Sequence, residues 1–326
     1  MRTHTIRWLG SIVVALAIAT NHRAAAQGWE VFPDSSGPAK VFAYSEKYGS
    51  AATGQINPDA TLTTFRDYDS GQFGGWSHVV GCGSEILFYD KTSGTMALGH
   101  VDLAGDFHAT MFRSAYFIPG WDTIVIHNGY LLFYDKESGY AVAGRFDNDA
   151  FRPYGYWPSL GANFTHIVST AQGLLFYNAD NGDAVRRDWT YASVPTGGPF
   201  FQIVGVGLES KPTKPWIAAG WTHLVDSGDG VLFYNASNGY NVMTDLYSDG
   251  TLSTRFATAR VIQSGYTSVV AGNHNVLFYD TANGDVAIGA VRQFDWSGGA
   301  LAIRAVYPAY FLPDRSQIVT YVDPVF

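Results

Sequence analysis

The sequence predicts an all-β protein, a six-bladed β-propeller whose blades each contain four strands. Three observations lead to this prediction: an aromatic block recurs along the chain, its copies are evenly spaced, and no long helical period follows residue 26. Repeats of about 45 residues with four short strands match a propeller blade. One or two β-sandwiches are the alternative, which the regular spacing of similar copies disfavours.

The first repeated block is an apolar residue followed by Phe, Tyr and Asp or Asn, and then by a turn that ends in Gly. Consecutive apolar positions suit a strand that is buried on both faces. The Gly suits a turn position with positive φ, and the Asp or Asn can accept a hydrogen bond from the backbone two residues later. Five full copies begin at Leu87, Leu132, Leu175, Leu232 and Leu277, and a degenerate copy begins at Phe42. The turn glycines are Gly49, Gly94, Gly139, Gly182, Gly239 and Gly284.

A second block, which begins Gly-Trp in three copies, precedes each of the last five copies of the first. The N-terminal copy lacks it, but the far C-terminus supplies one at residues 314–319. This offset predicts that the C-terminal strand pairs with the N-terminal blade and closes the ring. The steps between copies are 45, 45, 43, 57 and 45 residues, so the fourth blade carries an insertion at about residues 190–215. We expect the insertion to be an extended surface loop.

Residues 1–26 are predicted to be a signal peptide, and residues 27–326 a single propeller domain that is secreted or periplasmic. Arg2 and Arg7 precede an apolar run at 8–20, and Ala24-Ala25-Ala26 offers a cleavage site. Cleavage would remove three arginines and no acid, which moves the formal net charge from −8 to −11. An acidic chain of this kind is not expected to bind nucleic acid or anionic lipid. No other segment is long and apolar enough to predict a membrane span.

The sequence favours a binding protein over an enzyme. It contains no G-x-S-x-G elbow, no H-E-x-x-H helix and no P-loop, so we assign no catalytic residue, metal ion or cofactor. Its single cysteine, Cys82, rules out an intramolecular disulfide.

Three histidines, His78, His166 and His223, share one repeat position. If that position faced the central channel, the rings could bind zinc or copper. The other copies have Thr123, Ser268 and Gln317 there, which favours a polar group that forms hydrogen bonds across blades.

The candidate ligand-binding residues are aromatic. Trp76, Trp121 and Trp221 open the second block at a loop-to-strand junction, where a ring can be half exposed. If this strand is innermost, the rings share a face with the turns, where Tyr140 and Tyr240 follow the turn glycines. A half-exposed ring beside hydrogen-bonding groups suits the apolar face and hydroxyl rim of a sugar. Packing between blades is the alternative role for these residues.

The two blocks together resemble blades of secreted bacterial propeller lectins, of the tachylectin-like and fucose-binding group. The resemblance runs from Lys40 to Val319 and implies a multivalent protein whose partners are glycans. No sugar-contacting motif matches residue by residue, so the resemblance transfers no site. The alternative is a secreted hydrolase or lyase with one active site over the channel. In that case one blade should depart from the repeat, and the 190–215 insertion could supply this departure.

The predicted signal peptide leads to the first testable prediction. We expect the exported protein to begin near Gln27, because the basic residues, the apolar run and the alanines have the order of a cleaved signal peptide. Intact-mass measurement of secreted material checks this, and a mass that retains residues 1–26 would contradict it.

Overall fold

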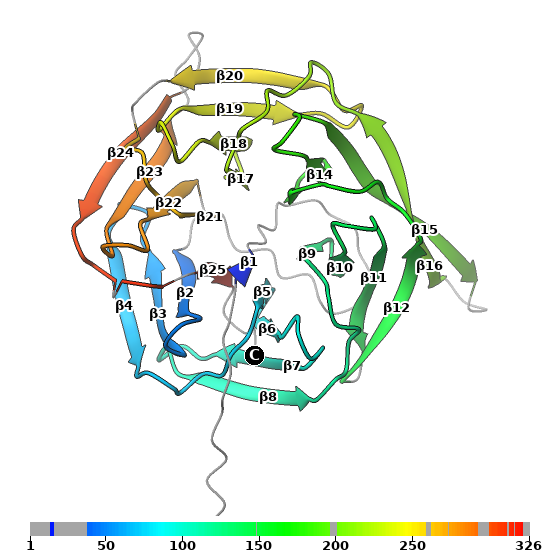
Figure 1. The fold of residues 1–326 in the computed structure, drawn as a ribbon, viewed down its shortest axis with the longest axis horizontal. Helices are drawn as coiled ribbons and strands as arrows, with labels where there is room; N and C mark the ends of the chain where they lie inside the picture. Colours follow the sequence, from blue (N-terminus) through cyan, green and yellow to red (C-terminus); the bar gives the residue numbers. More distant parts are fainter. Residues whose placement is uncertain are drawn as a thin grey trace, which may run out of the picture.

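The computed structural model describes residues 14–15, 38–147, 149–195, 201–258, 262–272, 274–292, 300–311, 313–315 and 317–321. In these ranges the chain forms strands and turns and no helix. Six sheets stand around a central axis like the blades of a propeller, which confirms the predicted fold (Figure 1). The strands of each blade follow one another from the centre of the ring to its rim.

The first three blades each place their strands in this inner-to-outer order. Blade one contains β25 (Gln317–Tyr321), β2 (Ala39–Ser45), β3 (Ser50–Ile56) and β4 (Leu62–Tyr68). Blade two contains β5 (His78–Cys82), β6 (Glu85–Tyr89), β7 (Met96–Val101) and β8 (Phe107–Arg113). Blade three contains β9 (Thr123–His127), β10 (Tyr130–Tyr134), β11 (Ala141–Asp147) and β12 (Ala150–Trp157).

The remaining three blades have the same order. Blade four contains β13 (His166–Thr170), β14 (Gly173–Tyr177), β15 (Ala184–Pro195) and β16 (Phe201–Pro212). Blade five contains β17 (His223–Asp226), β18 (Val231–Tyr234), β19 (Asn241–Leu246) and β20 (Leu252–Thr258). Blade six contains β21 (Ser268–Gly272), β22 (Asn275–Tyr279), β23 (Val286–Arg292) and β24 (Ala300–Tyr307).

The C-terminal strand closes the ring, as the sequence predicts. β25 pairs antiparallel with β2, with Val319 opposite Phe42 and Gln317 opposite Tyr44. Both ends of the propeller therefore belong to one sheet, and no blade is left with a partner on one side only.

One short strand lies near the centre of the ring. β1 (Val14–Ala15) pairs in parallel with β5 through Val14 opposite Val79 (Figure 1). The other five sheets end at their innermost strands.

The aromatic block forms the second strand of each blade, and it is buried on both faces. Phe88 packs in one cluster with Phe42 of blade one, while its neighbour Tyr89 packs in another with Phe133 of blade three. Successive side chains of a strand point to opposite faces, so one strand fills two inter-blade layers.

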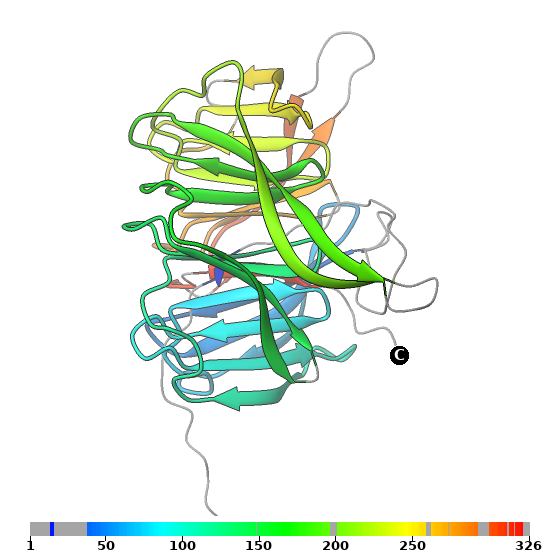
Figure 2. The same ribbon diagram turned by 90° about the vertical axis from the view of Figure 1, so that its right-hand side faces the viewer.

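The insertion in blade four is not the extended surface loop that we expected. Its described residues lengthen the third and fourth strands, and β15 pairs with β16 from Val185 opposite Pro212 to Pro195 opposite Phe201. The hairpin projects from the rim of the ring (Figure 2). Aromatic and β-branched residues, including Trp189 and Tyr191, suit a paired strand and explain the difference.

The turn glycines have positive φ, as predicted; Gly94, for example, has φ +71°. The Gly94 amide donates to Asp90 O at 2.8 Å, and the Asp90 carboxylate accepts from the Thr92 amide at 2.9 Å. A Cβ at Gly94 would lie 2.0 Å from Phe117 O, in the loop that leads to the next blade. The glycine therefore meets two demands, backbone conformation and close approach.

These two demands can be separated by experiment. Gly94→Ala should destabilise the protein more than Gly129→Ala, because Gly129 has a similar φ of +74° but open space where its Cβ would lie. Strain alone predicts a loss of about 1–2 kcal/mol for Gly129→Ala. Urea unfolding of both variants measures the difference. Equal losses would show that the contact with Phe117 O is unimportant.

Candidate functional site

The loops into the innermost strands and the turns after the second strands lie on one face of the ring, here called the turn face. The Gly120 amide donates to Lys91 O at 2.9 Å, and the Phe117 amide donates to Gly94 O at 2.9 Å. Each entry loop thus rests on the turn of the preceding blade. This juxtaposition brings the candidate Trp and Tyr residues together.

Two of the candidate pairs form nearly identical stacks. The rings of Trp121 and Tyr140 lie 5.6 Å apart at 17°, and those of Trp221 and Tyr240 lie 5.6 Å apart at 18°. Tyr240 is 37% exposed, whereas both tryptophans are buried. Tyr140 is half-buried and packs against the core cluster that contains Trp121. Tyr240 is therefore the more exposed of the two tyrosine rings, and each ring lies over a buried tryptophan.

The expectation that Trp76, Trp121 and Trp221 would be half exposed is wrong. Their exposed fractions are 6%, 4% and 8%. In blades three and five the residue after the turn glycine covers the indole. In blade two that residue is Thr95, and Trp76 packs instead against Phe88 and Phe112.

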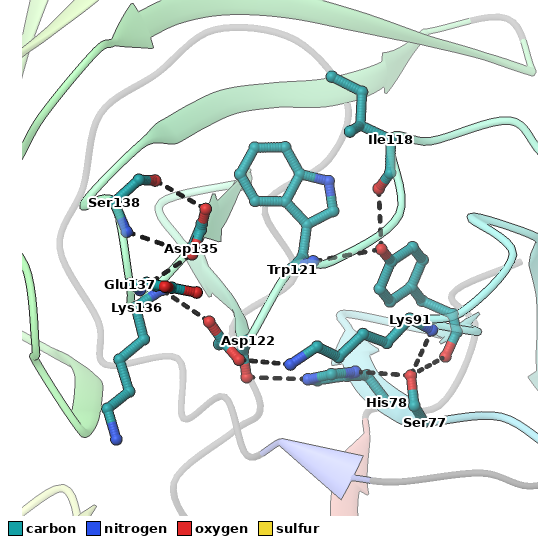
Figure 3. A network of polar contacts seen from close by, with 11 residues as sticks. Ser77, His78, Lys91, Ile118, Trp121, Asp122, Asp135, Lys136, Glu137 and Ser138 are labelled. Carbon is teal, nitrogen blue, oxygen red and sulfur yellow. Dashed lines mark hydrogen bonds and ion pairs between the residues drawn. The ribbon is translucent and has the colours of Figure 1, made fainter.

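The three repeat histidines form hydrogen bonds across blades, as the favoured interpretation predicts. Nε2 of His78 lies 2.9 Å from Asp122 O, Nε2 of His166 lies 2.9 Å from Thr222 O, and Nε2 of His223 lies 3.1 Å from Thr267 O. Since a carbonyl only accepts, Nε2 carries the proton in each ring. Figure 3 shows this contact between blades two and three.

The other nitrogen of each ring meets the hydroxyl of the preceding residue. Nδ1 lies 3.0 Å from Ser77 Oγ in His78 and 2.9 Å from Thr222 Oγ1 in His223. Burial lowers the pKa of all three imidazoles, so near neutral pH Nδ1 is unprotonated and is an acceptor. The single hydroxyl hydrogen has two acceptors within reach, Nδ1 and a backbone carbonyl such as Tyr89 O at 3.2 Å from Ser77 Oγ. Both ring nitrogens thus have partners within the protein. Among the residues that the structure describes, no group of three or more His, Cys, Asp or Glu could hold a metal ion.

An ion pair joins the same two blades at the turn face. Lys91 of blade two pairs with the Asp122 carboxylate, whose other oxygen accepts from the Lys136 amide at 2.7 Å (Figure 3). Asp122 therefore links the turn of blade two to the turn of its own blade.

Sequence reasoning missed an exposed tryptophan on the turn face. Trp216 is 82% exposed and lies in the loop from β16 to β17, near the Gly182 turn that Ile217 O contacts. Ile118 occupies the entry loop of blade three and is 62% exposed. Neither residue belongs to the repeated blocks, so the repeat carries no signal for them.

The face opposite the turns holds a Ser–His–Asp cluster that bears on the hydrolase alternative. Ser169 Oγ lies 3.0 Å from His127 Nδ1, and His127 Nε2 lies 3.7 Å from Asp188 Oδ1. A serine nucleophile must reach its substrate, but Ser169 is 5% exposed. Asp188 also pairs with Arg186. The cluster therefore lacks an open reacting atom.

Comparisons with known proteins support the fold and no family. No protein-family model and no curated protein matches the chain. Among solved structures, a candidate 6-phosphogluconolactonase from Bacteroides uniformis has a TM-score of 0.51 at 14% identity, with 85% of this chain and 84% of that chain covered. A functionally unknown protein from Desulfotomaculum acetoxidans has a TM-score of 0.50 at 9% identity, with 85% and 82% covered.

These similarities show the propeller fold alone, because the identities are low. They do not support the tachylectin-like and fucose-binding lectin group that the repeat resembles. Within the described part of the chain, no helix has the length and apolarity needed to cross a membrane.

A buried carboxyl lies at the end of β17, where Asp226 accepts from the Gly228 amide at 2.9 Å. Burial is the main cause that raises the pKa of Asp226 to about 7, and the nearby Asp229 charge adds to it. Between pH 4 and pH 7 the folded state therefore holds a proton that the unfolded state has lost. Wild-type stability should fall as pH rises through this window.

Replacement by the neutral isostere tests that linkage. Asp226→Asn should gain about 2–4 kcal/mol relative to wild type between pH 4 and pH 8, because Asn carries no charge to bury. Urea unfolding at the two pH values measures the gap. Asp147→Asn, at a surface ion pair with Arg152, controls for the loss of one negative charge. A gap that stays constant or shrinks with pH would refute the linkage.

Proposed function

We propose that the protein is a secreted, multivalent carbohydrate-binding propeller whose shallow sites lie on the turn face. The two matching stacks carry this proposal: one buried tryptophan stacks on the half-buried Tyr140, and another stacks on the exposed Tyr240. Sugars present an apolar ring face to which a rigid aromatic side chain can bind at small cost in conformational entropy.

Each platform has a polar side chain beside it. The Tyr140 amide donates to Ser138 Oγ at 3.0 Å, and the Tyr240 amide donates to Asn238 Oδ1 at 2.8 Å. Ser138 and Asn238 are exposed, so groups that can hydrogen-bond sugar hydroxyls stand next to both rings. In this proposal the two tyrosines contact the glycan, and Trp121 and Trp221 position the tyrosine rings.

A single platform is expected to bind weakly. A shallow, wet surface recovers little of the free energy that is lost when a ligand is ordered. Two platforms on one rigid ring raise the effective concentration of the second sugar once the first has bound. The natural ligand is therefore a glycan with several exposed sugars rather than a free monosaccharide.

A glycan array followed by binding to an immobilised hit tests the proposal. The double variant Tyr140→Ala/Tyr240→Ala should lose about 100-fold or more in avidity, because both platforms disappear. The double Phe variant should keep most binding, since it preserves the stacked rings. Tyr156→Ala is the matched control, as this tyrosine is 60% exposed and lies on the outer strand β12.

Two outcomes would contradict the proposal. Wild-type protein that binds no glycan on the array would exclude the function. A folded double Ala variant that binds like wild type would exclude the site, and turnover of a substrate at one site would favour the hydrolase or lyase alternative.

A further inference from the structure

Blade one departs from the repeat at three positions that lie close together. Arg315 replaces the aromatic residue that opens the second block in the other blades, and Ser50 replaces the residue after the turn glycine, such as Tyr140. The third position is Asp67 in β4, which lies opposite Ala52 of β3. At the equivalent register position the outer strands of the other blades have Phe112, Tyr156, Pro212, Ala257 and Val306. An aromatic and apolar contact, such as Trp76 on Phe112 in blade two, has become a polar one.

The Arg315 guanidinium is buried with few partners. Its side chain is 1% exposed, and Nη1 donates to Ser50 Oγ at 3.0 Å. Nη2 lies 3.8 Å from Asp67 Oδ1, beyond hydrogen-bond distance, and Nε has no partner among the described residues. A guanidinium has five N–H donors, and burying them without acceptors costs free energy. At this separation Nη2 and Oδ1 do not bond to each other, so each can form a hydrogen bond with its own ligand atom.

A pocket of about 360 Å³ opens at this place on the turn face. Its lining includes Tyr48, Ser50, Asp67, Asp69, Ser70 and Arg315. Tyr48 is 44% exposed, and Lys47 Nζ lies over its ring, 4.8 Å from the centroid. Arg315 comes from the entry loop of the closing strand, whereas Asp67 comes from the rim strand, so the pocket exists only when the ring is closed.

The charges around the pocket select the class of ligand. Asp314 also lines the pocket but pairs with Lys47 at 2.8 Å, so Asp67 and Asp69 remain beside one cation, Arg315. A carboxylate or phosphate would meet two negative charges, and an ammonium group has no acceptor for the guanidinium N–H groups. A neutral ligand with adjacent hydroxyls satisfies both sides, because one hydroxyl donates to Asp67 and its neighbour accepts from Nη2 of Arg315.

We propose that the pocket of blade one binds a single neutral sugar residue through a pair of adjacent hydroxyls, with Asp67 as acceptor and Arg315 as donor. This inference deepens the proposed carbohydrate binding but uses none of the platform residues. It gives the protein one specific site per chain in addition to its equivalent shallow ones.

Calorimetric titration of the mature protein with the methyl glycosides of galactose, glucose, mannose and fucose tests the inference. We expect one of them to bind with a stoichiometry of one. Asp67→Asn should weaken this binding about tenfold or more, the size expected for a hydrogen bond to a charged group. Asp67 is 73% exposed, so the variant should fold, and Asp147→Asn is the matched control.

A second variant probes the donor. Arg315→Lys keeps the charge but loses the planar fork, so it should also weaken binding while unfolding cooperatively. Binding of no glycoside by wild type, or equal affinity for wild type and Asp67→Asn, would overturn the inference. The two proposals separate in the Tyr140→Ala/Tyr240→Ala protein, where the pocket should still bind its monosaccharide although glycan avidity is lost.

Discussion

The ring depends on one repeated contact, the hydrogen bond from the buried tyrosine of a second strand to the entry loop of the next blade. Tyr89 Oη donates to Ile118 O at 2.8 Å and accepts from the Trp121 amide at 3.4 Å. A buried hydroxyl without partners would cost free energy. The entry loop must therefore place its backbone groups within hydrogen-bond distance of the tyrosine hydroxyl. The equivalent donors are Tyr44, Tyr134, Tyr177 and Tyr234, which bond to Gly74 O, Gly161 O, Ala218 O and Gln263 O.

The same contact explains why the tryptophans are buried. It holds the backbone amide of Trp121 against the preceding blade, so the indole enters the blade core beside Phe133 and beneath Tyr140. The tryptophans are therefore part of the fold, and in blade five the exposed ring is that of Tyr240, the residue after the turn glycine. That position varies between blades, from Ser50 and Thr95 to Tyr140 and Tyr240, without changing the contact that holds the ring.

The repeat made the architecture predictable from sequence, and the departures from it were harder to interpret. Blade count, ring closure and positive φ at Gly94 all follow from equivalent positions. The burial of Trp121 does not, because it depends on a ring contact with Tyr140, 19 positions later. The approach of Asp67 to Arg315 was also hidden, since the β3–β4 register shifts between Thr53 and Gly54. Such a bulge changes which side chains share a face.

The closing blade is where a departure from the repeat is easiest to accommodate. Blade one is assembled from both ends of the chain, so its innermost strand and its outer strand are encoded 249 or more residues apart and can change separately. Blade one has no Trp–Tyr stack, but it keeps two features of the other blades: the pairing of its two innermost strands, β25 and β2, and the buried Tyr279 hydroxyl, which accepts from the Arg315 amide at 3.0 Å. The hydrogen bond between the tyrosine hydroxyl and the backbone of the entry loop is retained, while the side chains above it become polar. In the proposed function, two similar platforms and one distinct pocket lie on a single face of a rigid ring, and their fixed spacing would select glycans whose branches match it.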